Sequence, residues 1–353
     1  MPVGSVIMAA VAVSIFFLVQ CLWYSQSILI PFIFAILICN LLSTISRFFQ
    51  KLPLLGKFFP RPLALCMAIL TVMMVCLFIA KVISGSMGQM LLSSASLEHK
   101  IAALLKSLAQ QGYTKAYLAD VLKSVLKELN IQGLITGFYA MISNLMSSLL
   151  LILLFVIFFF IESSHFQEKI SRIVENPQDR QKLRYLLREI PAQIQFYLGM
   201  KSLFSAITAT SIYVVMKVMG VEFAEFWAIC IFFMNFIPNF GAIVVTLIMT
   251  LFAYFQWSDL GTVSIFLIAQ LAIHGVVGNV LETHYLGRTM NLSPMVLLLS
   301  LCFWGMLWGG TGLFLAVPMT VFMMIILASF PSTRRYALLM SEKGELPEMS
   351  DDV

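Results

Sequence analysis

The most apolar stretch of the chain is Leu149-Leu-Leu-Ile-Leu-Leu-Phe-Val-Ile-Phe-Phe-Phe-Ile161, which contains no polar side chain. It lies inside an apolar run, residues 141–161, that matches the about 20 residues a helix needs to cross a hydrocarbon core. Comparable apolar runs on either side are residues 6–24, 28–45, 62–84, 201–219 and 263–281. Together with two longer apolar regions, they predict an all-α, polytopic integral membrane protein with about eight apolar regions.

The composition excludes several classes of protein. Hydrophobic residues make up 60% of the chain and charged residues 11%, whereas a soluble domain averages roughly a quarter charged residues. A soluble enzyme, a nucleic-acid-binding protein and a disordered scaffold are therefore excluded, and membrane lipid is the expected surrounding. The six cysteines lie in apolar runs without a Cys-x-x-Cys pair, and no ATP-binding or hydrolase motif occurs. We expect no catalytic residue, metal site or cofactor.

The two longer apolar regions do not fit one membrane crossing or two full ones. Residues 226–255 are interrupted by Asn235, Pro238, Asn239 and Gly241. Residues 295–327 are interrupted at Gly305 and again at Gly309, Gly310 and Gly312. Such interruptions at membrane depth are tolerated where the freed backbone groups face protein or a wet cavity. We predict that both regions are re-entrant helical hairpins or broken helices.

The distribution of basic residues orients the chain. The loop between the second and third runs holds Arg47, Lys51, Lys57 and Arg61 and no acid, so the positive-inside rule places this loop and both termini in the cytoplasm. Hairpins at both interruptions leave Asp259 outside and Arg288 inside, and single kinked passes would exchange them. We expect this order: residues 1–86 first three transmembrane helices, 87–140 extracytoplasmic amphipathic helices, 141–162 fourth span, 163–200 cytoplasmic amphipathic segment, 201–330 transport core, 331–353 cytoplasmic tail.

A row of polar residues lies in the seventh apolar region. Gln270, His274, Gly278 and Glu282 are spaced four apart, and Asn279 neighbours Glu282. A charged group at the centre of a bilayer costs about 2.5–3.5 kcal/mol even on the lenient insertion scale, so we expect the row to face the protein interior or water. It then marks a transport path or, alternatively, a structural polar seam between closely packed helices.

The interruption at residues 235–241 is the second candidate site. Pro238 has no N–H to donate and obstructs the carbonyl four residues before it, so free carbonyl groups could bind ions or polar solute atoms. The side-chain amides of Asn235 and Asn239 could add to them or, alternatively, only cap the two helices. Lys201 and Lys217 lie near opposite ends of the fifth run, and we expect both to snorkel to the membrane interfaces.

Three blocks of sequence resemble the autoinducer-2 exporter family of bacterial permeases. They are Asn235-Phe-Ile-Pro-Asn-Phe-Gly241, the segment from Gly278 to Arg288 with Leu292-Ser-Pro294, and Phe303 to Gly312 followed by Val317-Pro318. The resemblance covers nearly the whole chain and implies a secondary transporter, since family members are associated with autoinducer-2 export or with sodium/proton antiport. Thr283 departs from the family, in which Pro usually follows the residue matching Glu282.

We therefore expect a secondary transporter of the bacterial inner membrane that moves a small polar solute. One alternative is a sodium/proton antiporter, in which Glu282 and His274 would titrate, and another is a non-transporting scaffold that binds partners through residues 97–129. A homo-oligomer is plausible because the amphipathic helices expose apolar faces. The expected solute- or ion-binding residues are Asn235, Pro238, Asn239, Gly241, His274, Asn279, Glu282, Gly309, Gly310 and Gly312.

Overall fold

The computed structural model describes residues 3–51, 63, 66–86, 131–173, 177–238, 240–286, 292–330, 332–342 and 344. The helices of the first half are α1 (Val3–Tyr24), α2 (Gln26–Lys51), a helix at Cys66–Ser86, α5 (Ile131–Ser147), α6 (Leu149–Ile173) and α7 (Pro177–Met219). Those of the second half are α8 (Ala224–Met234), α9 (Phe240–Trp257), α10 (Leu260–Ile273), the π-helix η1 (His274–Glu282), α11 (Thr283–Leu286), α12 (Pro294–Ser329) and α13 (Arg334–Met340). The amphipathic residues 97–129, Asn239 and Arg288 lie outside the described residues.

Length and apolar composition make most of these helices membrane spans. Six are long and apolar enough to cross a bilayer, and α5 with α6 would make a seventh. In the described part of the chain the only β-type pairing is an isolated bridge between Leu292 and Ser341. The all-α, polytopic architecture is thus confirmed, and the expected eight apolar regions are close to the spans found.

Two boundaries differ from the prediction. Ser148 interrupts the expected fourth span, so that α5 ends one residue before it and α6 begins one residue after it. Residues 163–173 of the expected cytoplasmic segment continue α6, whereas residues 177–200 and the expected fifth span are parts of a single helix, α7, of 43 residues. Its apolar part begins at Ala192 rather than at Lys201. An amphipathic pattern followed by an apolar run therefore does not by itself mark a helix end.

One compact unit contains the described parts of residues 1–68, 147–198 and 289–353. Within it α2 packs against α6, because the Phe32 ring lies 5.5 Å from the Phe155 ring and 5.2 Å from the Phe159 ring. The indole N–H of Trp308 donates to the carbonyl of Leu22 at 3.2 Å, which joins α12 to α1. Aromatic packing thus holds α2 against α6, and one part-buried hydrogen bond joins the two terminal segments of the chain.

The same unit contains the second interrupted region, α12, which is a helical hairpin. Trp308 and Gly309 leave helical geometry, and Gly309 has a φ of 60°. The Ser300 hydroxyl donates to the Ala316 carbonyl at 3.1 Å and contacts the Thr320 hydroxyl, so the two arms are antiparallel. The expected additional interruption at Gly305 is wrong, because this residue is helical.

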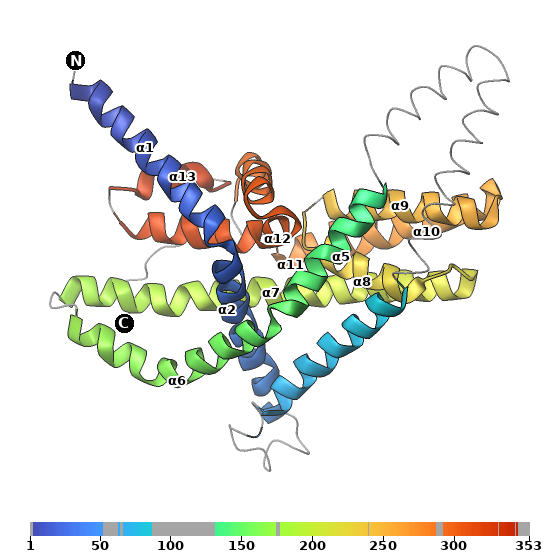
Figure 1. Ribbon diagram of the computed structural model, residues 1–353, viewed down its shortest axis with the longest axis horizontal. Coiled ribbons are helices and arrows are strands. Elements are labelled where there is room, and N and C mark those ends of the chain that lie inside the picture. Colours follow the sequence, from blue (N-terminus) through green and yellow to red (C-terminus); the bar gives the residue numbers. More distant parts are fainter. Residues whose placement is uncertain are drawn as a thin grey trace. The chain divides into compact units, whose positions relative to one another are not determined.

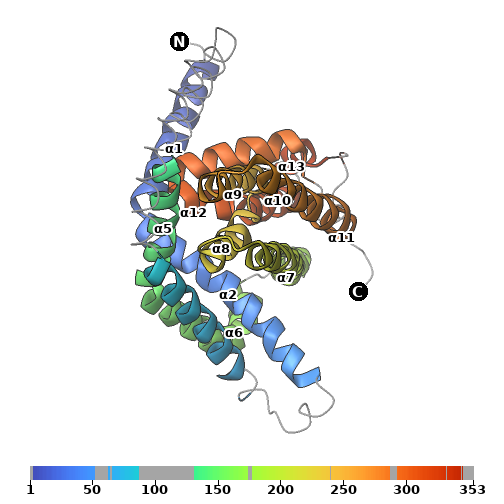
Figure 2. The same ribbon diagram turned by 90° about the vertical axis from the view of Figure 1, so that its right-hand side faces the viewer.

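The other unit contains the described parts of residues 69–146 and 199–288. The C-terminal half of α7 runs beside α8, α9 and α10 (Figure 1). Seen nearly end-on in Figure 2, α9 and α10 form one layer and α8 and α7 the other. The core between them contains fully buried side chains: Ile212, Met216, Phe226, Ile231, Met249 and Phe266.

The first interrupted region, α8 with α9, is also an antiparallel hairpin. The side-chain amide of Gln256, near the end of α9, donates to the Gly220 carbonyl at 2.7 Å and accepts from the Glu222 N–H at 3.0 Å. Helix α8 has 11 residues, or about 16 Å, roughly half the thickness of the hydrocarbon core. Helix α9 has 18 residues and is long enough to cross most of it. The hairpin alternative is therefore confirmed for both interrupted regions.

Helix α10 packs antiparallel on α9 and begins at a capped end. The Asp259 carboxylate accepts from the N–H groups of Gly261 at 3.3 Å and Thr262 at 2.8 Å, and from the Thr262 hydroxyl. These hydrogen bonds lower the pKa of Asp259, the hydroxyl of Thr262 contributing most. A carboxylate that accepts backbone N–H groups at a helix N-terminus stabilises the first turn.

Candidate functional site

The tip of the first hairpin is shaped by one glycine. A Cβ atom on Gly241 would lie 1.6 Å from the carbonyl oxygen of Met234, so any other residue would push the two arms apart. The Gly241 N–H donates to the Ile237 carbonyl at 3.1 Å, and the Phe240 N–H to the Pro238 carbonyl at 2.7 Å. Pro238 and Gly241 therefore set the geometry of the tip, and the tip in turn positions Asn235.

Asn235 is buried at the end of α8 and points to α7. Its side-chain amide donates to the hydroxyl of Ser205 at 3.3 Å. Its backbone N–H continues the helix by donating to the Ile231 carbonyl at 2.9 Å. Asn235 is thus a buried polar group that faces the protein interior, and its partner Ser205 was not predicted.

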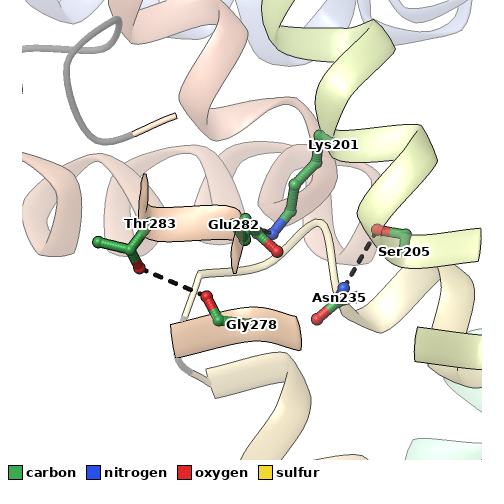
Figure 3. Close-up of polar contacts among 6 residues, drawn as sticks. All are labelled: Lys201, Ser205, Asn235, Gly278, Glu282 and Thr283. Atoms are coloured by element: carbon green, nitrogen blue, oxygen red, sulfur yellow. Dashed lines mark hydrogen bonds and ion pairs between the residues drawn. The ribbon is translucent and has the colours of Figure 1, made fainter. Parts of the chain in front are cut away.

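The Lys201 ammonium forms an ion pair with the Glu282 carboxylate (Figure 3). The expectation that Lys201 snorkels to the membrane surface is wrong, since this side chain is almost completely buried. The error arose because the apolar part of α7 begins at Ala192, nine residues before Lys201. This places the lysine about 14 Å inside the apolar segment instead of at its end.

Lys201 belongs to a polar face of α7. Lys201, Ser205 and Thr208 follow one another at helical spacing, and all three are buried. Ile212 and Met216 continue the same face as fully buried apolar residues. The Thr208 hydroxyl has no hydrogen-bond partner among the described residues. The three residues, which we call the α7 polar face, could have been found from their spacing of four and three in an apolar run.

Glu282 is presented to α7 by an unusual helix. The nine residues of η1 form a π-helix, a rare form found mostly as single turns and frequently at functional sites. At its end the Thr283 hydroxyl donates to the Gly278 carbonyl at 3.4 Å (Figure 3). The irregularity therefore persists although Thr283 replaces the proline common in the resembling family. Asn279, on the same helix, is exposed.

The first residues of the predicted polar row, Gln270 and His274, lie near the contact between α9 and α10. Gln270 is fully buried and donates through its amide to the Thr250 hydroxyl at 3.3 Å. The amide oxygen of Gln270, the Nε2 atom of His274 and the hydroxyl of Thr246 have no partner among the described residues. Gln270 thus contacts α9, whereas Glu282 contacts α7. The predicted polar row therefore does not face a single neighbouring helix.

The second interrupted region lies in the other unit. Gly309 and Gly310 are exposed, and Gly312 is buried. A Cβ atom on Gly312 would lie 1.8 Å from the Trp304 carbonyl oxygen, which matches the role of Gly241 in the first hairpin. In both hairpins a glycine allows the two arms to approach closely, and the assignment of Gly309, Gly310 and Gly312 to the binding site stays a prediction. Within the described residues no three His, Cys, Asp or Glu side chains are grouped to hold a metal ion.

Comparison with known proteins gives a consistent result. The AI-2E family transporter model matches residues 9–332. A putative transport protein of Haemophilus influenzae is 28% identical over 240 residues, which is 68% of this chain and 65% of that protein. A putative transport protein of Borreliella burgdorferi is 28% identical over 264 residues, covering 71% and 73%. The AI-2 transport protein TqsA of Escherichia coli is 26% identical over 321 residues, covering 90% and 91%.

Proposed function

This chain belongs to the AI-2E family of transporters, and from that premise we propose that it carries a small, uncharged, hydroxyl-rich solute as a secondary transporter. Membrane transport itself follows from the family and from the apolar helices. The Escherichia coli relative is named an AI-2 transport protein, which supports autoinducer-2 as the first solute to test. The basic loops support insertion in the inner membrane with both termini in the cytoplasm.

The observation that carries this proposal is the burial of hydroxyl and amide groups on the α7 polar face and at the hairpin tip. Ser205, Thr208 and Asn235 are buried within otherwise apolar helices. Polar groups at this depth are costly and face protein or a polar path. Lys201 and Glu282 add opposite charges, so the site has no net charge. Hydroxyl and amide groups without net charge suit a solute that donates and accepts hydrogen bonds.

Transport assays with the purified full chain test this proposal. Proteoliposomes are supplied with autoinducer-2, and its initial rate of entry is measured against protein-free liposomes. We expect Asn235→Ala and Thr208→Val each to lower the rate about ten-fold, because one lost hydrogen bond to the solute is worth about 1–1.5 kcal/mol. Glu222→Gln is the matched control, since Glu222 is exposed at the opposite end of α8. Equal rates for Asn235→Ala and wild type would contradict the proposal.

A sodium/proton antiporter is the second candidate. The observation that favours it is a pair of titratable groups on η1: the Glu282 carboxylate, and His274, whose Nε2 atom has no partner among the described residues. In proteoliposomes with an internal pH dye, an imposed sodium gradient would change the internal pH, and Glu282→Gln would abolish the change. A flat dye signal in wild type together with autoinducer-2 uptake selects the solute carrier.

A further inference from the structure

The ion pair Lys201–Glu282 lies where charged groups are uncommon. Both residues belong to helices apolar enough to cross a membrane, α7 from Ala192 onward and the segment from Leu260 to Tyr285. The side chains are 6% and 16% exposed. Charged residues at such positions are expensive and mark ion or solute pathways by default. The pair therefore needs an explanation beyond the packing of two helices.

Stability alone does not provide this explanation. Replacing a buried ion pair by apolar residues of similar volume is often neutral or stabilising, because the apolar pair avoids the cost of removing two charges from water. Neighbouring positions on the same face of α7, Ile212 and Met216, pack as fully buried apolar residues. Apolar side chains therefore pack well on this face of α7 one and two turns beyond the α7 polar face, so packing does not require charged residues there.

The position of the ammonium group suggests a use. It places one positive charge against a carboxylate at the end of a π-helix (Figure 3). Ser205 lies about one helical turn further along α7, and Asn235, at the end of α8, donates to it. A carboxylate with nearby hydroxyl and amide oxygens is the ligand set that hard cations prefer. In carriers with interrupted helices, unwound backbone carbonyls and the C-terminal ends of half-helices coordinate sodium as the coupling ion.

We propose that the Lys201 ammonium is a tethered cation that occupies the place of a coupling sodium ion at Glu282. Transport by this chain therefore proceeds without sodium, and removal of the ammonium converts Glu282 into a sodium site. The statement about transport rests on the proposed solute carriage, whereas the statement about the sodium site rests on the ion pair alone. Lys201 is thus a specificity-determining residue for the coupling of the carrier.

Sodium binding is tested on the purified full chain in detergent. The melting temperature is followed while sodium chloride replaces choline chloride at constant ionic strength. We expect no shift for wild type, and a rise with sodium for Lys201→Ala and for Lys201→Asn, whose amide oxygen can add a ligand. The double variant Lys201→Ala with Glu282→Gln has no carboxylate, so we expect its melting temperature not to respond.

Lys217→Ala is the matched control, because Lys217 lies on the same helix as Lys201 and pairs with Glu225 of α8, but its side chain is half exposed. Its melting temperature should not respond to sodium. The proposal is overturned if neither Lys201 variant responds, if wild type responds equally, or if both variants fail to fold in sodium, since sodium should restore the missing charge. These outcomes do not depend on whether a transported solute has been found.

Transport measurements test the statement that transport by this chain proceeds without sodium. Autoinducer-2 uptake by wild type should be equal in sodium and in choline medium. Uptake by Lys201→Ala should fall about ten-fold in choline and recover in sodium, which corresponds to about 1.4 kcal/mol of lost interaction. Wild-type uptake that requires sodium would overturn the inference while leaving the proposed function intact. Absence of uptake in every medium would contradict the proposed function, and the melting experiment would still decide about the sodium site.

Discussion

Helix α7 supplies the lysine of two Lys–Glu pairs that differ in their surroundings, with Glu282 on η1 and Glu225 on α8. Lys201 and Glu282 have side chains 6% and 16% exposed. Lys217 and Glu225 have side chains 51% and 41% exposed, with 2.6 Å between the ammonium and the carboxylate oxygen. The same two residue types therefore form an ion pair inside an apolar segment and another at its aqueous end. The comparison teaches that burial within an apolar helix, rather than the presence of an ion pair, distinguishes a candidate functional site from an ordinary surface ion pair.

The buried pair should respond most strongly to the loss of one partner. Glu282→Gln leaves the Lys201 ammonium buried opposite a neutral amide, and we expect the free energy of unfolding to fall by about 3–5 kcal/mol. Unfolding of the purified chain in mixed micelles with increasing dodecyl sulfate measures this change. A loss as small as that of an exposed pair would show that water reaches Lys201 and would remove the distinction between the two pairs.

Removing both charges should separate stability from transport. In Lys201→Met with Glu282→Leu no charge is left buried, and we expect the free energy of unfolding to return to within about 1 kcal/mol of wild type, or above it. The same proteins are then assayed for solute uptake, which we expect to be lost. Normal uptake by this apolar double variant would mean that the pair only holds two helices together.

The exposed pair should respond much less to the same kind of change. We expect Glu225→Gln to lower the free energy of unfolding by less than about 1 kcal/mol, since water screens a half-exposed pair. The Tyr213 hydroxyl, which donates to Glu225 at 3.3 Å, can also donate to the new amide oxygen. The measurement is again unfolding in mixed micelles, and a loss near that of Glu282→Gln would contradict the comparison.

The salt dependence of the coupling energy should also differ between the two ion pairs, and this is the smallest of the expected effects. Raising potassium chloride from about 0.01 M to about 1 M shortens the screening length from about 30 Å to about 3 Å. In double-mutant cycles, we expect the coupling of Lys217 with Glu225 to decrease as the salt concentration rises, because water and salt screen this exposed pair. The coupling of Lys201 with Glu282 should stay constant, and a parallel decrease in both would show that both pairs are in water.

Much of the fold follows from sequence, because membrane spans are set by the length of apolar runs. The two hairpins follow from polar, proline and glycine residues inside runs too long for one crossing. The interruption at Ser148 could not be predicted, since Ser147 and Ser148 are ordinary residues within spanning helices. The continuity of α7 has no signal in the pattern, because a helix can pass from an amphipathic to an apolar stretch without a break.

Part of the candidate site was also predictable. Asn235 and Glu282 were selected as polar residues in apolar runs, and both lie in polar contacts of one unit. The depth of Lys201 does not follow from the apolar run alone, because the apolar part of α7 begins nine residues before it, at Ala192. Ser205 was missed because single hydroxyl residues are common in spanning helices and become informative only when a neighbour one turn away is charged. The close approach of Gly241 to Met234 depends on the hairpin geometry and has no signal in the pattern.

The π-helix η1 has a consequence for insertions and deletions. In such a helix each N–H bonds five residues back instead of four, so each turn holds more residues than in an α-helix. Deleting one residue from an α-helix rotates everything after it by about 100°. In η1 a deletion can instead be absorbed by conversion to α-helical bonding. We therefore expect residues 274–282 to tolerate the loss of one residue better than the α-helical parts of the same span.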